Sequence, residues 1–354
     1  MNSCSLDKLI RNLQTDAALI MSDVNRQYFS GFSSSAGTML VTRKKTYFIT
    51  DFRYIAAARA TVVGCEVLLQ DELYLQLNHI IRENDIKTLA VETKEVTLSQ
   101  FENLKKKLNV TLVSTPFLSD TTEHLREIKS EYEINCIKKA QQITDETFDH
   151  ICGFIKPGIT ENEISLEIFN QMKKLGAQSE AFSSIVASGK NGASPHFVCS
   201  DKPVCQGEMI TMDFGAVFGG YCSDMTRTVA LGKIDSTCKK VYDTVLQAQT
   251  LALENISAGK SCKEIDAIAR DYIYKNGYQG CFGHSLGHSC GLVCHETPSL
   301  SPKCEDILKP NMVLTVEPGV YIDGICGVRI EDMVIIRDKS CENITKSKKE
   351  LITL

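Results

Sequence analysis

The fold expected for this chain is decided by residues 209–231, which read MITMDFGAVFGGYCSDMTRTVAL. Two β-rich runs flank Gly219-Gly220, a pattern typical of a hairpin with a two-residue loop. In that register Asp213 lies opposite residue 226 and Asp224 opposite residue 215, so both aspartates share one face of the sheet. Two such carboxylates repel each other unless a cation lies between them. Exposure of one or both to solvent is the alternative, but their apolar neighbours favour an interior position.

Histidines cluster further along the chain, in GHSLGHSCGLVCHETP, residues 283–298. Three of the seven histidines, His284, His288 and His295, lie in this segment, within twelve consecutive positions. The interleaved glycines keep side chains away from the space above the backbone, as close approach of a ligand requires. A single histidine would more often be structural, whereas three of them together favour a functional site.

Two glutamates lie in the C-terminal run VLTVEPGVYIDGICGVRIEDMVIIR, residues 313–337. Glu317 and Glu331 are surrounded by strand-like apolar sequence, where an unpaired carboxylate is costly. Arg329 is two residues from Glu331 and shares its face of the strand, so an ion pair between them is one expectation. That pair would leave Glu317 without a partner.

Together these segments supply four carboxylates and one imidazole: Asp213, Asp224, His288, Glu317 and Glu331. Two divalent cations would balance their formal charge. Oxygen-rich ligands with one histidine suit Mn²⁺ first, with Co²⁺, Zn²⁺ or Fe²⁺ as alternatives. Two ions roughly 3.5–4 Å apart form the hydrolytic arrangement in which a carbonyl is polarised and a water is activated.

Length and composition limit the remaining possibilities. A chain of 354 residues suggests two domains. A net charge of −5 from 39 basic and 44 acidic residues gives no basic field for nucleic acid. Charges interrupt the N-terminal apolar sequence, and no run of about 18 apolar residues follows, so neither export nor a membrane span is expected. Fifteen cysteines, an odd number without a CxxC pair, favour buried thiols in a reducing cytoplasm.

The pattern along the chain is α/β. Short apolar runs alternate with helical patterns up to about residue 120, including a hairpin at 37–50, and a long helix is expected from about 126 to 155. In the second part, Gly158-Ile-Thr160-Glu-Asn-Glu163 recurs about 101 residues later as Gly259-Lys-Ser261-Cys-Lys-Glu264. Each segment reads as a capping box that starts a helix, which predicts two similar α/β halves.

At these motifs the chain resembles the aminopeptidase P and prolidase group of metallopeptidases, which share the pita-bread fold. The resemblance also covers NRQYFSGFSSSAG (25–37) and TDFRY (50–54). It implies a creatinase-like N-terminal domain at 1–122 and a pita-bread catalytic domain at 123–354. It further implies a cytoplasmic homodimer that hydrolyses peptides with Xaa-Pro N-termini and binds two divalent ions per subunit.

The resemblance also assigns roles residue by residue. Asp213 binds one metal, His288 and Glu317 bind the other, and Asp224 and Glu331 bridge both. Glu317 is also the general base. His196 and His295 hydrogen-bond the substrate and stabilise the tetrahedral intermediate, and His284 lines the pocket for proline. Arg329 does not bind metal itself but orients the residues that do.

Three functions remain open at this point. Removal of the first residue from Xaa-Pro peptides is the leading hypothesis. Cleavage of Xaa-Pro dipeptides, the prolidase reaction, uses the same metal site. A catalytically silent pita-bread binding protein is disfavoured because all five ligand residues are present.

Overall fold

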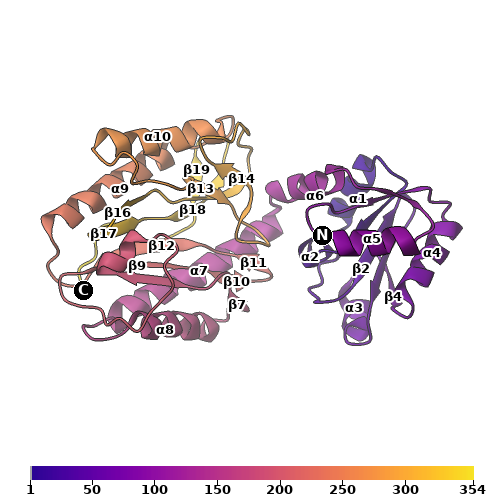
Figure 1. Cartoon of the computed structure of the whole chain (residues 1–354), viewed down its shortest axis with the longest axis horizontal. Coiled ribbons are helices and arrows are strands. Elements are labelled where there is room, and N and C mark those ends of the chain that lie inside the picture. The colour runs from indigo at the N-terminus through magenta and orange to yellow at the C-terminus, as the bar shows by residue number, and fades with distance from the viewer. Residues whose placement is uncertain (1) are drawn as a thin grey trace. The chain divides into compact units, whose positions relative to one another are not determined.

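The computed structural model describes the main chain of residues 2–354 and the side chains of residues 5–354. The chain divides into two compact units, Met1–Arg126 and Glu127–Leu354 (Figure 1). The domain boundary expected after residue 122 falls inside helix α6 (Phe117–Glu127), just before this division. None of the helices within residues 2–354 is both long and apolar enough to cross a bilayer.

The first unit contains a mixed sheet in the order β4-β3-β2-β1-β5-β6. Its strands are β1 (Ala17–Ile20), β2 (Thr38–Thr42), β3 (Thr46–Thr50), β4 (Glu66–Leu69), β5 (Thr88–Val91) and β6 (Thr111–Val113). The helices that precede α6 are α1 (Asn2–Asn12), α2 (Asp23–Ser30), α3 (Ile55–Thr61), α4 (Leu73–Glu83) and α5 (Leu98–Lys107). The hairpin predicted at 37–50 is the antiparallel pair β2–β3. Helices α1, α2 and α3 were not predicted.

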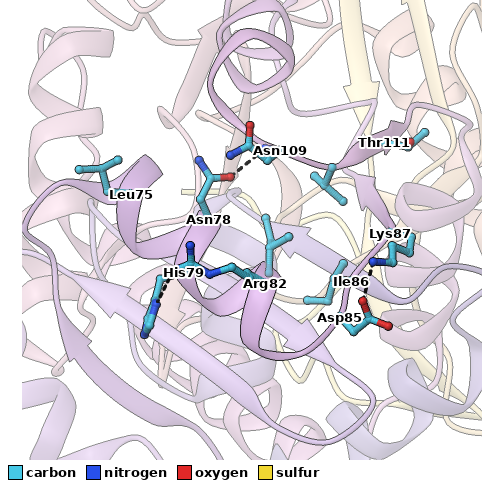
Figure 2. A pocket seen from close by; sticks show the side chains of 11 residues that line it. Leu75, Asn78, His79, Arg82, Asp85, Ile86, Lys87, Asn109 and Thr111 are labelled. Carbon is cyan, nitrogen blue, oxygen red and sulfur yellow. Dashed lines mark hydrogen bonds and ion pairs between the residues drawn. The ribbon is translucent and has the colours of Figure 1, made fainter.

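A pocket of about 860 Å³ lies in this first unit, beside α4 and the segments that lead into β5 and β6 (Figure 2). Its cations are engaged locally: Lys87 pairs with Asp85 at 2.5 Å, and Arg82 contacts the His79 ring at 3.3 Å. The lining contains none of the nine residues singled out from the sequence. The candidate site therefore has to lie elsewhere.

The second unit places two helix pairs on opposite sides of its strands, α7 with α8 and α9 with α10 (Figure 1). These helices are α7 (Glu131–Phe154), α8 (Glu161–Lys174), α9 (Ser236–Asn255) and α10 (Cys262–Lys275), with a 3₁₀ turn η1 (Gly189–Ala193). The strands of the first half are β7 (Ser179–Glu180), β8 (Ile185–Ser188), β9 (Met209–Phe214), β10 (Ala216–Phe218), β11 (Tyr221–Cys222) and β12 (Met225–Ala230). Those of the second half are β13 (Gly287–Ser289), β14 (Glu296–Leu300), β15 (Val313–Val316), β16 (Gly319–Ile322), β17 (Cys326–Arg329), β18 (Asp332–Ile336) and β19 (Cys341–Asn343).

The start of α7 differs from the prediction. Instead of one helix from about 126, α6 ends at Glu127 and α7 begins at Glu131. Ser130 accepts a hydrogen bond from the Glu133 backbone N–H, and the Glu133 side chain accepts from the Ser130 backbone N–H. The first N–H groups of a helix have no partner within the helix, and this capping box supplies them with acceptors. It therefore allows a new helix, α7, to begin at Glu131.

The predicted internal repeat has a matching backbone pattern. Gly158 N–H donates to the Val204 carbonyl, and Gly259 N–H donates to the Leu308 carbonyl, each at 2.9 Å. An isolated bridge joins Thr160 to Pro203 in the first half and Ser261 to Ile307 in the second. The two halves therefore start their second helices in the same way, as a duplicated α/β unit requires.

Only one of the two predicted capping boxes is complete. Thr160 and Glu163 cap each other reciprocally. Ser261 accepts from Glu264 N–H at 3.2 Å, but the Glu264 carboxylate pairs instead with Lys260 at 2.8 Å. The lysine, four residues before the glutamate, offers a charged partner that competes with the backbone N–H.

Candidate metal centre

The first two carboxylates lie in β9 and directly before β12. Phe218 lies opposite Tyr221 across the Gly219-Gly220 loop, and Asp213 lies opposite Thr226. This is the register predicted from the sequence. Asp224 directly precedes β12 and is only 4% exposed, so the interior position is confirmed for it, while the Asp213 side chain is 13% exposed.

The second half of the unit brings its glutamates to the same place through the backbone. Glu331 N–H donates to the Thr226 carbonyl at 3.1 Å, which ties the β17–β18 junction to β12. Glu317 N–H donates to the Leu286 carbonyl at 2.7 Å, which ties the β15–β16 junction to the histidine-rich segment. Both glutamates therefore lie at strand ends, where a side chain can turn toward a site.

The predicted ligands meet in one cluster. Ligand atoms of Asp224, His288 and Glu331 all lie within 4.8 Å of one another. His288 Nε2 is 3.3 Å from Glu317 Oε1 and 3.6 Å from Asp224 Oδ2. The imidazole thus faces two carboxylates from two different strand segments, as a metal ligand would.

Asp213 connects to the cluster through Arg329. The Arg329 guanidinium, 3% exposed, donates to Asp213 Oδ2 at 2.6 Å. The alternative pair of Arg329 with Glu331 is not formed, because Glu331 Oε2 accepts instead from the Thr226 hydroxyl at 2.7 Å. Arg329 Nε donates to that same hydroxyl oxygen at 3.0 Å, so the threonine links the arginine to Glu331.

Three carboxyl groups in this cluster, those of Asp224, Glu317 and Glu331, have raised pKa values. Burial and the charge of Asp213 raise the pKa of Asp224 well above its ordinary value, and burial and Asp224 do the same to the pKa of Glu331. Burial raises the pKa of Glu317 to about 8. Burial and the neighbouring His295 lower the pKa of His288 to about 4, which keeps the imidazole neutral and able to bind a cation.

Two buried carboxylate oxygens, Asp213 Oδ1 and Glu331 Oε1, have no hydrogen-bond partner among the described residues. A buried carboxylate oxygen without a donor is costly unless a cation satisfies it. Oxygen donors with one neutral imidazole are also the ligands that hard and borderline divalent ions prefer. The arrangement fits a divalent metal site.

The remaining histidines lie at different distances from this cluster. The His295 ring packs against the His288 ring, with centroids 4.2 Å apart. His284 Nε2 is 2.9 Å from the Tyr321 hydroxyl, and burial and Arg329 lower the pKa of His284 to about 4. His196 lies on an exposed segment, and its charge is among those that lower the pKa of His284. His295 therefore contacts a predicted ligand, His284 connects to Arg329 through Tyr321, and His196 acts on His284 through its charge.

Sequence reasoning missed several residues that hold the site. Tyr321 accepts from Arg329 at 2.8 Å and so links the arginine to His284. Arg270 donates to the carbonyls of Phe282 and His284, and it forms a two-point ion pair with Asp266. The four-residue spacing of Asp266 and Arg270 on one helix was a visible signal for that pair. No local pattern indicated Tyr321, because His284 is 37 residues away and the contact with Arg329, eight residues away, forms only once β16 pairs with β17.

Residues 135–338 match metallopeptidase family M24, and residues 5–128 match the creatinase/prolidase N-terminal domain. The chain belongs to metallopeptidase family M24 and is a peptide hydrolase by that membership. The resemblance inferred from the motifs and the expected fold, a creatinase-type N-terminal domain followed by a pita-bread domain, are thereby confirmed.

Individual relatives match almost end to end. The uncharacterized peptidase YqhT of Bacillus subtilis strain 168 is 41% identical over 351 residues, which cover 99% of both proteins. A solved Xaa-Pro dipeptidase from Bacillus anthracis has a TM-score of 0.97 and 40% identity over 100% of both chains. An X-Pro aminopeptidase from Thermotoga maritima has a TM-score of 0.91 and 36% identity, covering 98% of this chain and 100% of that one. The names of the two solved structures divide between the two activities that the sequence leaves open.

Proposed function

We propose that this protein is an Xaa-Pro aminopeptidase that removes the first residue from peptides with proline at the second position. The observation that carries the proposal is the buried cluster of Asp224, His288, Glu317 and Glu331, joined to Asp213 through Arg329. All nine residues to which the resemblance gives a role belong to the second unit. We keep the expected domains, 1–122 and 123–354, as part of the proposal.

Two divalent ions, Mn²⁺ in our proposal, would be held by the five ligands and would polarise the scissile carbonyl. Glu317 accepts a proton from the attacking water. His295 and His196 donate hydrogen bonds to the substrate carbonyl as negative charge develops on its oxygen. His284 contacts the proline ring, and its orientation is held by Tyr321.

A charge argument favours the aminopeptidase over the dipeptidase reaction. An Xaa-Pro dipeptide ends in a carboxylate one residue beyond the scissile bond, and that carboxylate needs a cationic partner. Arg329 already donates to Asp213, Tyr321 and Thr226. His284 is neutral because its pKa is lowered to about 4. A longer peptide has an uncharged carbonyl at that position and needs no charged partner from Arg329 or His284.

Proline explains why such a site would be specialised. An Xaa-Pro bond is a tertiary amide whose ring fixes φ and which has no N–H to donate. A peptidase that recognises backbone N–H groups therefore binds it poorly. A site that orients the preceding carbonyl through bound ions and histidines does not need that donor.

The test of substrate choice removes bound metal, restores Mn²⁺, and compares kcat/KM for an Xaa-Pro-Pro tripeptide with kcat/KM for the corresponding Xaa-Pro dipeptide. We expect no hydrolysis without metal and a preference for the tripeptide after Mn²⁺ is restored. A preference for the dipeptide would make the enzyme a prolidase with the same site. Absence of metal-dependent cleavage of either peptide would favour the binding-protein alternative.

A second prediction concerns His295. We expect His295→Ala to lower kcat/KM by an amount equivalent to about 2.7–4 kcal/mol, because a donor to the developing oxyanion is lost. The matched control is His150→Ala, which removes an exposed histidine paired with Glu167 in the same unit. Steady-state kinetics on the tripeptide measure both variants. An unchanged kcat/KM for His295→Ala would contradict the assigned role.

We also propose that the enzyme is a cytoplasmic homodimer. The cysteines from Cys65 to Cys341 all carry free thiols, which suits a reducing compartment. Sedimentation equilibrium of the purified chain tests the dimer. A mass close to the 39.2 kDa of one chain would contradict it.

A further inference from the structure

A cysteine contacts one of the predicted metal ligands. The Cys294 thiol donates a hydrogen bond to Asp224 Oδ2, with sulfur and oxygen 2.9 Å apart. The same oxygen lies 3.6 Å from His288 Nε2. The Cys294 thiol therefore hydrogen-bonds to the same Asp224 oxygen that faces the His288 imidazole.

Burial makes this contact important to Asp224. The aspartate is 4% exposed and Cys294 is 5% exposed, so solvent has little access to either. A buried carboxylate needs donors to hold one orientation. Thr226 and Thr315 supply such donors to Glu331 and Glu317, at 2.7 and 3.2 Å. Cys294 does for Asp224 what those hydroxyls do for the glutamates.

The loop that carries Cys294, between β13 and β14, is fixed on both sides. Cys290, which is fully buried, donates from its thiol to the Cys222 carbonyl at 3.5 Å, and its N–H donates to the Val313 carbonyl at 3.0 Å. On the other side, Glu296 pairs with the buried ammonium of Lys129 at 3.1 Å. The backbone that carries Cys294 is thus anchored before and after this residue.

Close packing under the loop adds to this constraint. A side chain at Gly291 would come within 2.4 Å of the Glu296 carboxylate, so the loop and that ion pair are in direct contact. The next residue, His295, packs against His288. The same short loop therefore positions both the Cys294 thiol, which contacts Asp224, and the His295 ring, which contacts His288.

We propose that Cys294 is a positioning residue for metal binding: its thiol orients the Asp224 carboxylate toward the metal site and is not itself a ligand. The inference rests on the proposed metal site. Removal of a residue that hydrogen-bonds to a metal ligand typically weakens metal binding by about 10–100-fold.

The experiment titrates metal-free protein with Mn²⁺ and measures the Kd by calorimetry, without substrate. We expect Cys294→Ala to raise the Kd about 10-fold or more. Cys294→Ser, which keeps a donor, should restore much of the affinity. The control is Cys262→Ala, a fully buried cysteine at the start of α10 in the same unit, which should bind Mn²⁺ like the wild type.

Each outcome decides between roles. Equal Kd values for the wild type and Cys294→Ala, or equal weakening in Cys262→Ala, would overturn the positioning role while leaving the proposed function intact. An intense sulfur-to-cobalt absorption band in the Co²⁺-loaded wild type that is lost in Cys294→Ala would also overturn it, because sulfur would then be a ligand. Failure of the wild type to bind any metal would overturn the inference and the proposed function together.

Discussion

Glu317→Gln is expected to abolish peptide hydrolysis while leaving the fold in place. The substitution keeps the shape of the side chain but removes its ability to accept a proton and to contribute a negative charge. Loss of a general base alone lowers the rate by about 10²–10⁴-fold. The side chain lies 3.3 Å from His288 and accepts from Thr315, so the amide can occupy the same space.

The measurement is kcat/KM on an Xaa-Pro-Pro tripeptide with Mn²⁺ present, together with circular dichroism and bound-metal content. Glu254→Gln, an exposed change on α9 in the same unit, is the control and should leave kcat/KM unchanged. Activity of Glu317→Gln close to that of the wild type would rule out the proposed base. Retained metal with lost turnover would separate proton transfer from metal binding.

The hairpin of residues 209–231 could be predicted down to its register because that register depends on local chemistry. Gly219 and Gly220 both adopt positive φ, 60° and 83°, which a two-residue loop needs and glycine supplies without strain. Once the loop is fixed, strand alternation places Asp213 opposite Thr226. The apolar neighbours then decide which face is buried.

Partners distant in sequence could not be predicted in the same way. Their spacing predicts that Arg329 and Glu331 share a strand face, yet β17 ends at Arg329 and Glu331 lies in the junction before β18. Arg329 pairs instead with Asp213, which is 116 residues away. That choice depends on how the β17–β18 junction meets β9 and β12, and no local pattern encodes it. The contact of Cys294 with Asp224 spans 70 residues and was equally invisible, so the sequence favoured an inert thiol.

Another residue without a local signal, Arg227, should dominate the stability of the second unit. Its side chain is 1% exposed and donates to Asp332 Oδ1 at 2.6 Å and to the carbonyls of Ser347 and Lys348 at 2.8 and 3.0 Å. It therefore ties β12 to β18 and to the C-terminal segment. Burial works to raise the pKa of Asp332, but Arg227 and Lys349 outweigh burial and hold that pKa below its ordinary value.

We expect Arg227→Met to lower the free energy of unfolding by about 3–5 kcal/mol, because it removes the charged donor to Asp332 Oδ1 and leaves the buried carboxylate with Lys349 and Asn343, which both contact Oδ2. The control is Arg337→Met, which breaks an ion pair of the same 2.6 Å length with Glu342 whose side chains are 33% and 39% exposed. Solvent screens such a pair, so its loss should cost about 1 kcal/mol or less. Urea unfolding followed by circular dichroism measures both variants. If the two substitutions lower the free energy of unfolding equally, burial does not determine how much the Arg227–Asp332 pair stabilises the protein. Arg227→Met that fails to fold while Arg337→Met folds normally would place the cost at or above the upper end of the range.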